Sequence, residues 1–216
     1  MRKLILKMSI SIDGFVGGPN GEIDWIFGSM DEGVTAWLVD TLWLAGVHIM
    51  GSRTYQDMAA YWPSSTEPFA APMNEIPKVV FSRKGLVQSP NVTLTTAAFK
   101  DATRIKSPGD KKTLDIAPSI EASWIDVKVA SGDLAGEISR LKQQTGKAIL
   151  AHGGAGFARS LVESGLIDEY RLLIHPAVLG RGLSLFSGLT KPRDLKLVNT
   201  TVFGTGAVAH IYRPVA

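Results

Sequence analysis

The stretch KAILAHGGAGFARSLVESGLIDEY, residues 147–170, joins an apolar run, a glycine cluster and an amphipathic segment. Its hydrophobic pattern predicts a strand over 147–152 and a helix over 156–164, and a second strand follows over 169–180. Glycines between a strand and a helix let backbone N–H groups approach an anion, and the helix N-terminus favours negative charge. The stretch therefore predicts an α/β fold with a turn that can hold phosphate.

The same alternation of strands and helices continues on both sides of this stretch. A capping box predicts that one helix starts at Ser29, and Gly46 ends it. Residues 97–123 are polar and weakly periodic, which indicates an insertion or mobile loop within a single domain of residues 1–216. We expect a mostly parallel sheet with an antiparallel C-terminal hairpin. The other expected strands lie at 3–12, 47–51, 78–82, 124–131, 195–203 and 207–214, and the other expected helices at 52–62 and 132–146.

Composition excludes several classes of function. The chain has 23 Lys and Arg against 20 Asp and Glu, and the surplus of +3 lies within residues 100–112, so no broad basic face for nucleic acid is indicated. The absence of cysteine rules out disulfides, thiol catalysis and zinc–thiolate sites, and we expect no metal site. Lys7 interrupts the apolar N-terminus before a signal peptide can form, and no run reaches membrane length. We expect a cytoplasmic protein without a nucleic-acid or membrane partner.

The glycine turn departs from the dinucleotide fingerprint G-x-G-x-x-G. Gly154 and Gly156 supply the first two glycines, but Arg159 stands at the third position. The acidic pair Asp168 and Glu169 precedes the next strand, whereas a ribose-binding acid would follow it. A standard Rossmann domain is therefore not indicated. Two interpretations stay open: a phosphate-binding turn, or a tight turn that only packs strand on helix.

Two more strand ends carry groups suited to phosphate. The sequence GSRT, residues 51–54, follows one predicted strand and opens a helix, and SRK, residues 82–84, follows another. Three such ends match one ligand with a pyrophosphate and a third phosphate, which is NADPH. Arg83 and Lys84 suit the 2′-phosphate, which NAD lacks. A solvated surface is the alternative for Arg53, Arg83 and Lys84.

Four segments in chain order resemble a known family. They are MSISIDGFVGG (8–18), VHIMGSRTYQDM (47–58), KVVFSRK (78–84) and ILAHGGAGFARSLVESGLIDEYRLLIHPAVLGRGLSLF (149–186). The chain resembles the dihydrofolate reductase-like superfamily, most closely the riboflavin-biosynthesis reductase family, which forms the C-terminal domain of a bifunctional deaminase-reductase and also stands alone. The resemblance implies a three-layer α/β fold with a mixed, mainly parallel sheet, NADPH as cofactor and a homodimer.

The resemblance also implies roles for single residues. Met8 and Ser9 would line the nicotinamide pocket, Gly17 and Gly18 would belong to a loop that closes over it, and Ser184 would place a hydroxyl nearby. The residues implied on the adenosine side and around the pyrophosphate are Gly51, Ser52, Arg53, Thr54, Ser82, Arg83, Lys84, His152, Gly153, Gly154, Ala155, Gly156 and Phe157. A packed core residue is the alternative for His152.

Hydride transfer to an imine-like substrate requires a proton source, and aspartates near the first strand are the candidates. Asp24 precedes Trp25 at the end of the glycine-rich loop, where a carboxyl beside an indole could act as an acid or orient a substrate amine. Asp13 is the second candidate, with turn capping as its alternative, and Asp31 fits the first turn of a helix. Trp25 and Trp62 are expected to flank the substrate.

The sequence thus predicts an NADPH-dependent reductase acting on a small heteroaromatic or imine-like substrate, by default 5-amino-6-(5-phosphoribosylamino)uracil. A substrate phosphate would need a further cation, for which Lys7, Arg181 and Arg193 are candidates. The deaminase half is excluded because its zinc site needs cysteines. Dihydrofolate reductase is a second hypothesis, although Ile26 follows Trp25 where folate reductases have proline. A dimer that binds NADPH without turnover is a third.

Overall fold

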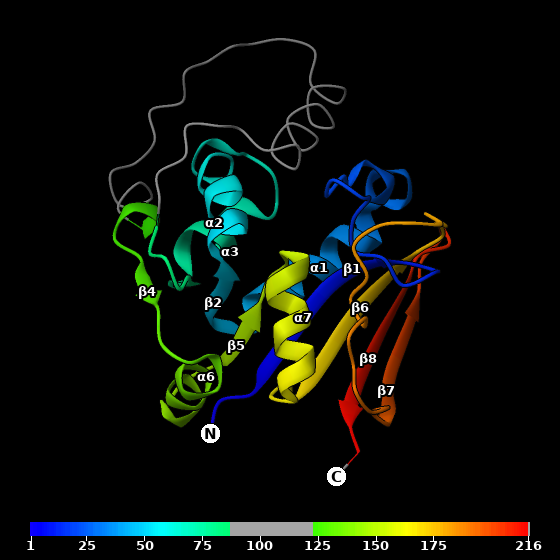
Figure 1. Ribbon diagram of the computed structural model, residues 1–216. Coiled ribbons are helices and arrows are strands. Elements are labelled where there is room, and N and C mark those ends of the chain that lie inside the picture. Colours follow the sequence, from blue (N-terminus) through cyan, green and yellow to red (C-terminus); the bar gives the residue numbers. More distant parts are fainter. Residues whose placement is uncertain (87–122, 216) are drawn as a thin grey trace.

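The computed structural model describes residues 1–86 and 123–215, which form an eight-stranded sheet with helices on both faces (Figure 1). The strands lie in the order β4-β3-β2-β5-β1-β6-β8-β7. The insertion expected at 97–123 lies outside the described residues except for Ser123. The strands are β1 Leu4–Ser11, β2 Ala45–Gly51, β3 Lys78–Phe81, β4 Lys128–Ala130, β5 Ala148–Ala151, β6 Glu169–His175, β7 Leu195–Val202 and β8 Val208–Pro214.

Strand pairing confirms the predicted sheet. β1 pairs in parallel with β5 and β6, β2 pairs in parallel with β3 and β5, and β3 with β4. β8 runs antiparallel to both β6 and β7, which forms the expected C-terminal hairpin at one edge. Residues 4–6 of β1 are apolar without interruption because helices cover both faces of the strand.

The two faces of the sheet are covered by two groups of helices. α6 Leu134–Gln143 and α7 Ala155–Ser164 bury Ile138, Leu141 and Leu161 against one face. α1 Glu32–Trp43, α2 Ser52–Ala59 and α3 Ala70–Glu75 cover the other face, with the short 3-10 helices η1 Asp24–Ser29 and η2 Trp62–Ser64 beside them. Each fully buried Leu or Ile contributes about 1.5–3 kcal/mol of hydrophobic free energy. The three-layer fold is therefore confirmed. Within residues 1–86 and 123–215, no helix is long and apolar enough to cross a membrane.

The helix start predicted at Ser29 is wrong, because the N-cap of α1 is Asp31. The Asp31 carboxylate accepts a hydrogen bond from the Val34 N–H at 2.7 Å, and its backbone has the extended conformation of an N-cap. Ser29 instead ends η1, and its hydroxyl lies 2.7 Å from Nδ1 of the buried His175 on β6. A contact with a distant strand thus occupies the side chain that the local pattern assigned to the cap.

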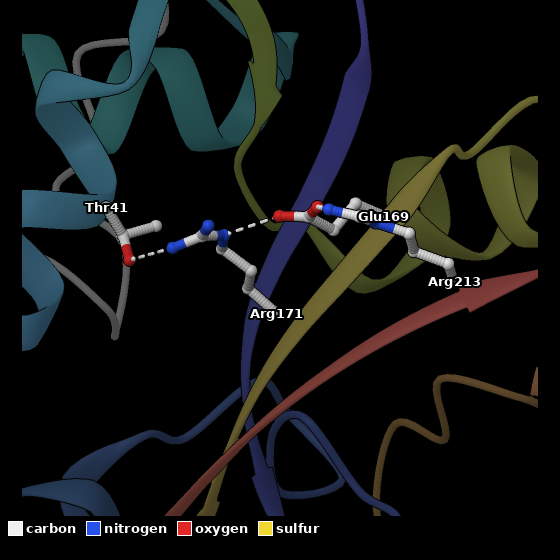
Figure 2. A network of polar contacts seen from close by, with 4 residues as sticks. All are labelled: Thr41, Glu169, Arg171 and Arg213. Carbon is white, nitrogen blue, oxygen red and sulfur yellow. Dashed lines mark hydrogen bonds and ion pairs between the residues drawn. The ribbon is translucent and has the colours of Figure 1, made fainter. Parts of the chain in front are cut away.

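A buried carboxylate ties β6 to β8 and to α1 (Figure 2). Glu169 is 4% exposed, and its carboxylate accepts from Nε of Arg171 at 2.9 Å and from Nη2 of Arg213 at 3.0 Å. Arg171 also donates to Oγ1 of Thr41 on α1 at 3.2 Å. Burial alone would raise the pKa of Glu169, but the hydrogen bonds and charges of the two arginines outweigh burial and lower it. The carboxylate therefore stays ionised in the folded protein.

Replacing Glu169 with alanine is expected to lower the free energy of unfolding by about 3 kcal/mol, because two arginines then lose their partner. Since folding lowers the pKa of Glu169, this stability is present at neutral pH and lost as pH falls below the unfolded value of about 4.3. Urea unfolding at neutral and acid pH measures both effects. The control is Glu75→Ala, which removes an exposed carboxylate on α3 and should cost under about 0.5 kcal/mol. Equal losses in the two variants would contradict the assignment.

Candidate active site

A cavity of about 970 Å³ opens at the carboxyl ends of β1, β2, β3 and β5. Its volume falls within the range of about 300–1,000 Å³ that is usual for ligand sites. In open α/β sheets, ligands bind at this edge, where the loops after the strands converge. Met8 and Ser9 of β1, Gly51 of β2 and Phe81 of β3 line it from the sheet side.

Most residues that the sequence predicts for cofactor and substrate lie around this cavity. They come from β1, the loop after it, the junction of β2 with α2, η2 and the junction of β5 with α7. The predicted residues that line it are Met8, Ser9, Gly17, Gly51, Ser52, Arg53, Thr54, Trp62, His152, Gly153, Gly154, Ala155, Gly156 and Phe157. The structure therefore brings these segments together, and their individual ligand contacts stay predictions.

The glycine turn after β5 packs closely against its neighbours. Gly154 has a φ of +51°, and a Cβ there would lie 2.8 Å from Oγ1 of Thr54 on α2. A Cβ at Gly153 would lie 3.5 Å from Cε of Met8 on β1. The left-handed backbone and the close approach of α2 both require glycine at 154. The turn thus joins three predicted cofactor segments into one surface.

Two helices begin at the cavity without side-chain caps. α2 starts after Gly51 and α7 starts after Gly154, and neither N-cap residue supplies a side-chain hydrogen bond. The first N–H groups of each helix have no intrahelical acceptor. Such N–H groups, together with the positive end of the helix dipole, stabilise an anion. The cavity wall can therefore hold anionic groups at two points.

Arg159 is a cavity residue that the sequence analysis noted only as a break in the fingerprint. Its Nη2 donates to the backbone oxygen of Ser184 at 3.2 Å, and its buried Nε has no partner within the described residues. An anionic ligand oxygen would satisfy this buried donor, which costs free energy when unpaired. Its i, i+3 spacing from Gly156 could have revealed it, because residues three apart share one face of a helix.

Five predicted cofactor residues are not among those that line the cavity. Arg83 and Lys84 are exposed after β3, and the Ser82 hydroxyl donates to the backbone oxygen of Gly85 at 2.6 Å. Since β3 pairs with β2 up to its end, these residues lie at the same edge of the sheet as the cavity. The two others are Gly18, which is buried, and Ser184, whose backbone oxygen accepts the bond from Arg159.

Neither predicted acid lines the cavity. Asp24 is exposed at the start of η1. The Asp13 carboxylate accepts from Oγ of Ser11 at 2.6 Å, from the Leu179 N–H at 3.1 Å and from the Gly180 N–H at 2.7 Å. The bond from Ser11, followed by those from the two N–H groups, lowers the pKa of Asp13. Asp13 therefore caps a loop, which is its structural alternative, and the catalytic roles of both aspartates stay predictions.

The two predicted substrate tryptophans lie in different surroundings. Trp62 is 6% exposed and lines the cavity, and its backbone oxygen accepts from Nδ2 of Asn74 at 3.0 Å. Trp25 donates from Nε1 to the backbone oxygen of Glu22 at 3.1 Å and meets the ring of His175 edge-on. It is not among the lining residues. Trp62 therefore lines the cavity and Trp25 packs the first loop against β6, and contact of either with a substrate stays a prediction.

Lys7 places a cation in the cavity wall. It lies on β1 and has no hydrogen-bond or ion-pair partner among residues 1–86 and 123–215. Burial lowers the pKa of Lys7 to about 8. The parallel register of β1 and β5 ends at Leu6 and Ala151, so the next two residues, Lys7 and His152, stand side by side. Of the three cations expected for a substrate phosphate, Lys7 is the one that lines the cavity.

The fold and this cavity define a dihydrofolate reductase-like α/β protein with a cavity at the carboxyl ends of its parallel strands. The model of the RibD C-terminal domain matches residues 2–209, and the chain belongs to this family. The uncharacterized protein YyaP of Bacillus subtilis is 31% identical over 213 residues, which cover 98% of this chain and 94% of the relative. The family is associated with reductase activity, which supports an oxidoreductase function for the chain.

Solved structures share this fold at low sequence identity. A diaminohydroxyphosphoribosylaminopyrimidine deaminase/5-amino-6-(5-phosphoribosylamino)uracil reductase from Thermotoga maritima matches with a TM-score of 0.63 and 17% identity, over 99% of this chain and 57% of that chain. A dihydrofolate reductase from Enterococcus faecalis, complexed with NADP(H), matches with a TM-score of 0.57 and 10% identity, over 99% and 97% of the two chains.

Proposed function

We propose that this protein is an NADPH-dependent reductase that transfers hydride to a small heteroaromatic or imine-like substrate. The observation that carries the proposal is the convergence of two uncapped helix N-termini with Arg53 and Arg159 on one cavity. Separate anion-binding points on one wall suit the phosphates of a dinucleotide. The solved complex of a dihydrofolate reductase of this fold with NADP(H) supports the choice of cofactor.

The remaining cavity residues suit the reaction. Bound NADPH would supply hydride to the carbon of a C=N bond, whose nitrogen takes one proton, and NADP⁺ would leave. Met8, Ser9 and Gly153 would hold the nicotinamide beside the glycine turn. Lys7 would donate to an oxygen of the substrate, and Asp57 on α2 is the carboxylate among the lining residues from which a proton can come.

The part of the cavity proposed for the substrate combines apolar walls with the Lys7 ammonium group. Ile23, Ile26, Met58, Tyr61 and Trp62 line it. Aromatic and aliphatic side chains around a few polar groups are typical of pockets for planar heterocycles. Together with the uracil reductase name of the Thermotoga structure, this supports a ribosylaminopyrimidine as the default substrate.

Consumption of NADPH by the full chain tests the proposal. We expect NADPH oxidation that depends on 5-amino-6-(5-phosphoribosylamino)uracil or another heterocycle, with one reduced product formed for each NADPH consumed. Reduction of dihydrofolate with tight methotrexate binding would favour a folate reductase instead. NADPH binding without oxidation across the substrate panel would favour a non-catalytic dimer. Absence of NADPH binding in calorimetry would overturn the proposal.

Replacing Arg83 and Lys84 together with alanine is expected to weaken NADPH binding by roughly 10–100-fold, because contacts of these two exposed side chains with a 2′-phosphate together contribute about 1.4–2.8 kcal/mol. NADH affinity should change less than about twofold, since NADH lacks that phosphate. Calorimetric titration with both cofactors measures the difference. The control replaces exposed Lys191 and Lys196, which removes the same charge elsewhere. Equal losses for NADPH and NADH would rule out the 2′-phosphate assignment.

The homodimer and the cytoplasmic location implied by the sequence stay predictions.

A further inference from the structure

A second histidine lies behind the cavity wall. His48 on β2 is fully buried, with 0% exposure, and is not among the residues that line the cavity. Its Nδ1 lies 2.6 Å from Nε2 of His152, and its Nε2 lies 3.2 Å from the backbone oxygen of Pro72. His152 is 3% exposed and lines the cavity. A continuous chain of hydrogen bonds therefore runs from a backbone carbonyl through two rings to the site.

The carbonyl at one end sets the protons on both rings. A carbonyl oxygen can only accept, so Nε2 of His48 must carry a proton toward Pro72. A neutral imidazole has one N–H, so Nδ1 of His48 is bare and accepts from Nε2 of His152. Nε2 of His152 thus carries the only proton of that ring. Its Nδ1 is left as an acceptor, without a partner among residues 1–86 and 123–215.

Both rings are neutral at physiological pH. Burial lowers the pKa of His48 to about 3 and holds the pKa of His152 well below its usual value, and the charge of Lys7 lowers both further. With both rings neutral, the two contacts allow one arrangement, in which Nε2–H of His48 donates to Pro72 and Nε2–H of His152 donates to Nδ1 of His48. The pair is therefore a fixed hydrogen-bond device whose rings are both neutral.

We propose that His48 is a positioning residue that holds His152 as its Nε2–H tautomer, so that the cavity presents a pure acceptor, Nδ1 of His152, beside the Lys7 ammonium. The ligand that binds there carries an N–H or amino group next to an oxygen acceptor. A carboxamide and an amino-substituted ring carbonyl both have this pattern, which the two side chains match as acceptor and donor. This assignment of ligand chemistry rests on the proposed function, whereas the tautomer does not.

Nitrogen NMR of ligand-free, histidine-labelled protein tests the tautomer directly, because protonated and bare ring nitrogens resonate far apart. We expect His152 in the wild type to carry its proton on Nε2 alone. His48→Gln should preserve this state, since an amide can accept from His152 and donate to the Pro72 oxygen. His48→Leu should give a mixture of tautomers. A proton on Nδ1 in the wild type, or an unchanged tautomer in a folded His48→Leu, would overturn the role of His48.

Binding measurements test the ligand chemistry. His48→Leu is expected to raise the Kd of NADPH or the KM of the substrate by about tenfold, the value of one hydrogen bond of about 1.4 kcal/mol, while kcat stays near wild type. His48→Gln should restore affinity to within about threefold.

If the nicotinamide carboxamide is the donor, the 3-acetylpyridine analogue of NADPH should bind His48→Leu as tightly as it binds the wild type. If the substrate is the donor, only its KM should change. Equal effects of the Leu and Gln variants, or no effect on either ligand, would contradict an acceptor role for His152.

Because the tautomer is measured without cofactor, its outcome does not depend on the proposed reductase activity. A correct tautomer in a protein that fails to oxidise NADPH would overturn the proposed function and leave the role of His48 intact. The wild-type spectrum also decides the question if His48→Leu does not fold.

Discussion

Lys7→Met is expected to lower kcat/KM for the proposed substrate by about 10²–10³-fold, the usual loss when one preorganised donor is removed from an active site. Lys7 lines the cavity without a partner in the described part of the chain, so a substrate oxygen would be its first strong acceptor. Methionine keeps the length and the unbranched shape of the side chain and removes only the ammonium group. Steady-state kinetics measure the effect. Lys3→Met, at an exposed position just before β1, is the matched control and should leave kcat/KM unchanged.

The same residue predicts a pH profile. Since burial lowers the pKa of Lys7 to about 8, kcat/KM of the wild type should fall as pH rises through 8, and this limb should vanish in Lys7→Met. Between about pH 8 and 10.4 the unfolded chain binds one more proton than the folded chain, so the stability of the free protein should rise with pH over that window. A profile that keeps its alkaline limb in Lys7→Met would show that another group titrates.

Gly154→Val is expected to weaken the binding of NADPH and NADH by at least about 100-fold. Backbone N–H groups at the start of α7 can reach a pyrophosphate only if no side chain intervenes, and two charged hydrogen bonds of about 1.5–3 kcal/mol each would be lost. The fold also resists this change, because φ is +51° and a Cβ meets Oγ1 of Thr54 at 2.8 Å. Fluorescence titration with both cofactors, paired with thermal unfolding, measures affinity and stability together.

Gly156→Ala separates lost binding from lost stability. A Cβ at Gly156 meets no atom within 4 Å, and its backbone is helical, so alanine should raise stability by about 0.5–1 kcal/mol. The methyl group would still stand at the start of α7, and NADPH affinity should fall by about tenfold. Gly136→Ala on α6, away from the cavity, is the control with gained stability and unchanged affinity. Wild-type affinity in both Gly154→Val and Gly156→Ala would mean that the turn only packs strand on helix.

The local pattern of the sequence predicted most strands and helices of the described chain, although α3 Ala70–Glu75 was not predicted and the strand expected over 124–131 is confined to Lys128–Ala130. The apolar run at residues 147–152 predicted a buried strand, and the helical spacing of apolar residues in 132–146 predicted a helix. Both predictions are confirmed, by β5 and α6 respectively. Both ends of α1 were also predicted wrongly, since the helix ends at Trp43 and Gly46 lies in β2. Ser29 fits the motif, but His175, far along the chain, takes its hydroxyl, and Asp31 caps the helix instead.

Periodicity and glycine placement within short stretches were sufficient to predict an α/β fold with a mostly parallel sheet and a turn at 153–156, whereas the three-layer architecture was implied by the family resemblance. Which polar groups meet at the site depends on contacts between segments far apart in the chain. Lys7 stands beside His152 through the β1–β5 register, and His48 meets His152 across 104 residues of chain. Asp13 and Trp25 pack loops, while Arg159 faces the cavity. The reason is physical: hydrophobic period fixes which side of an element is buried, but the order and register of strands fix which side chains become neighbours.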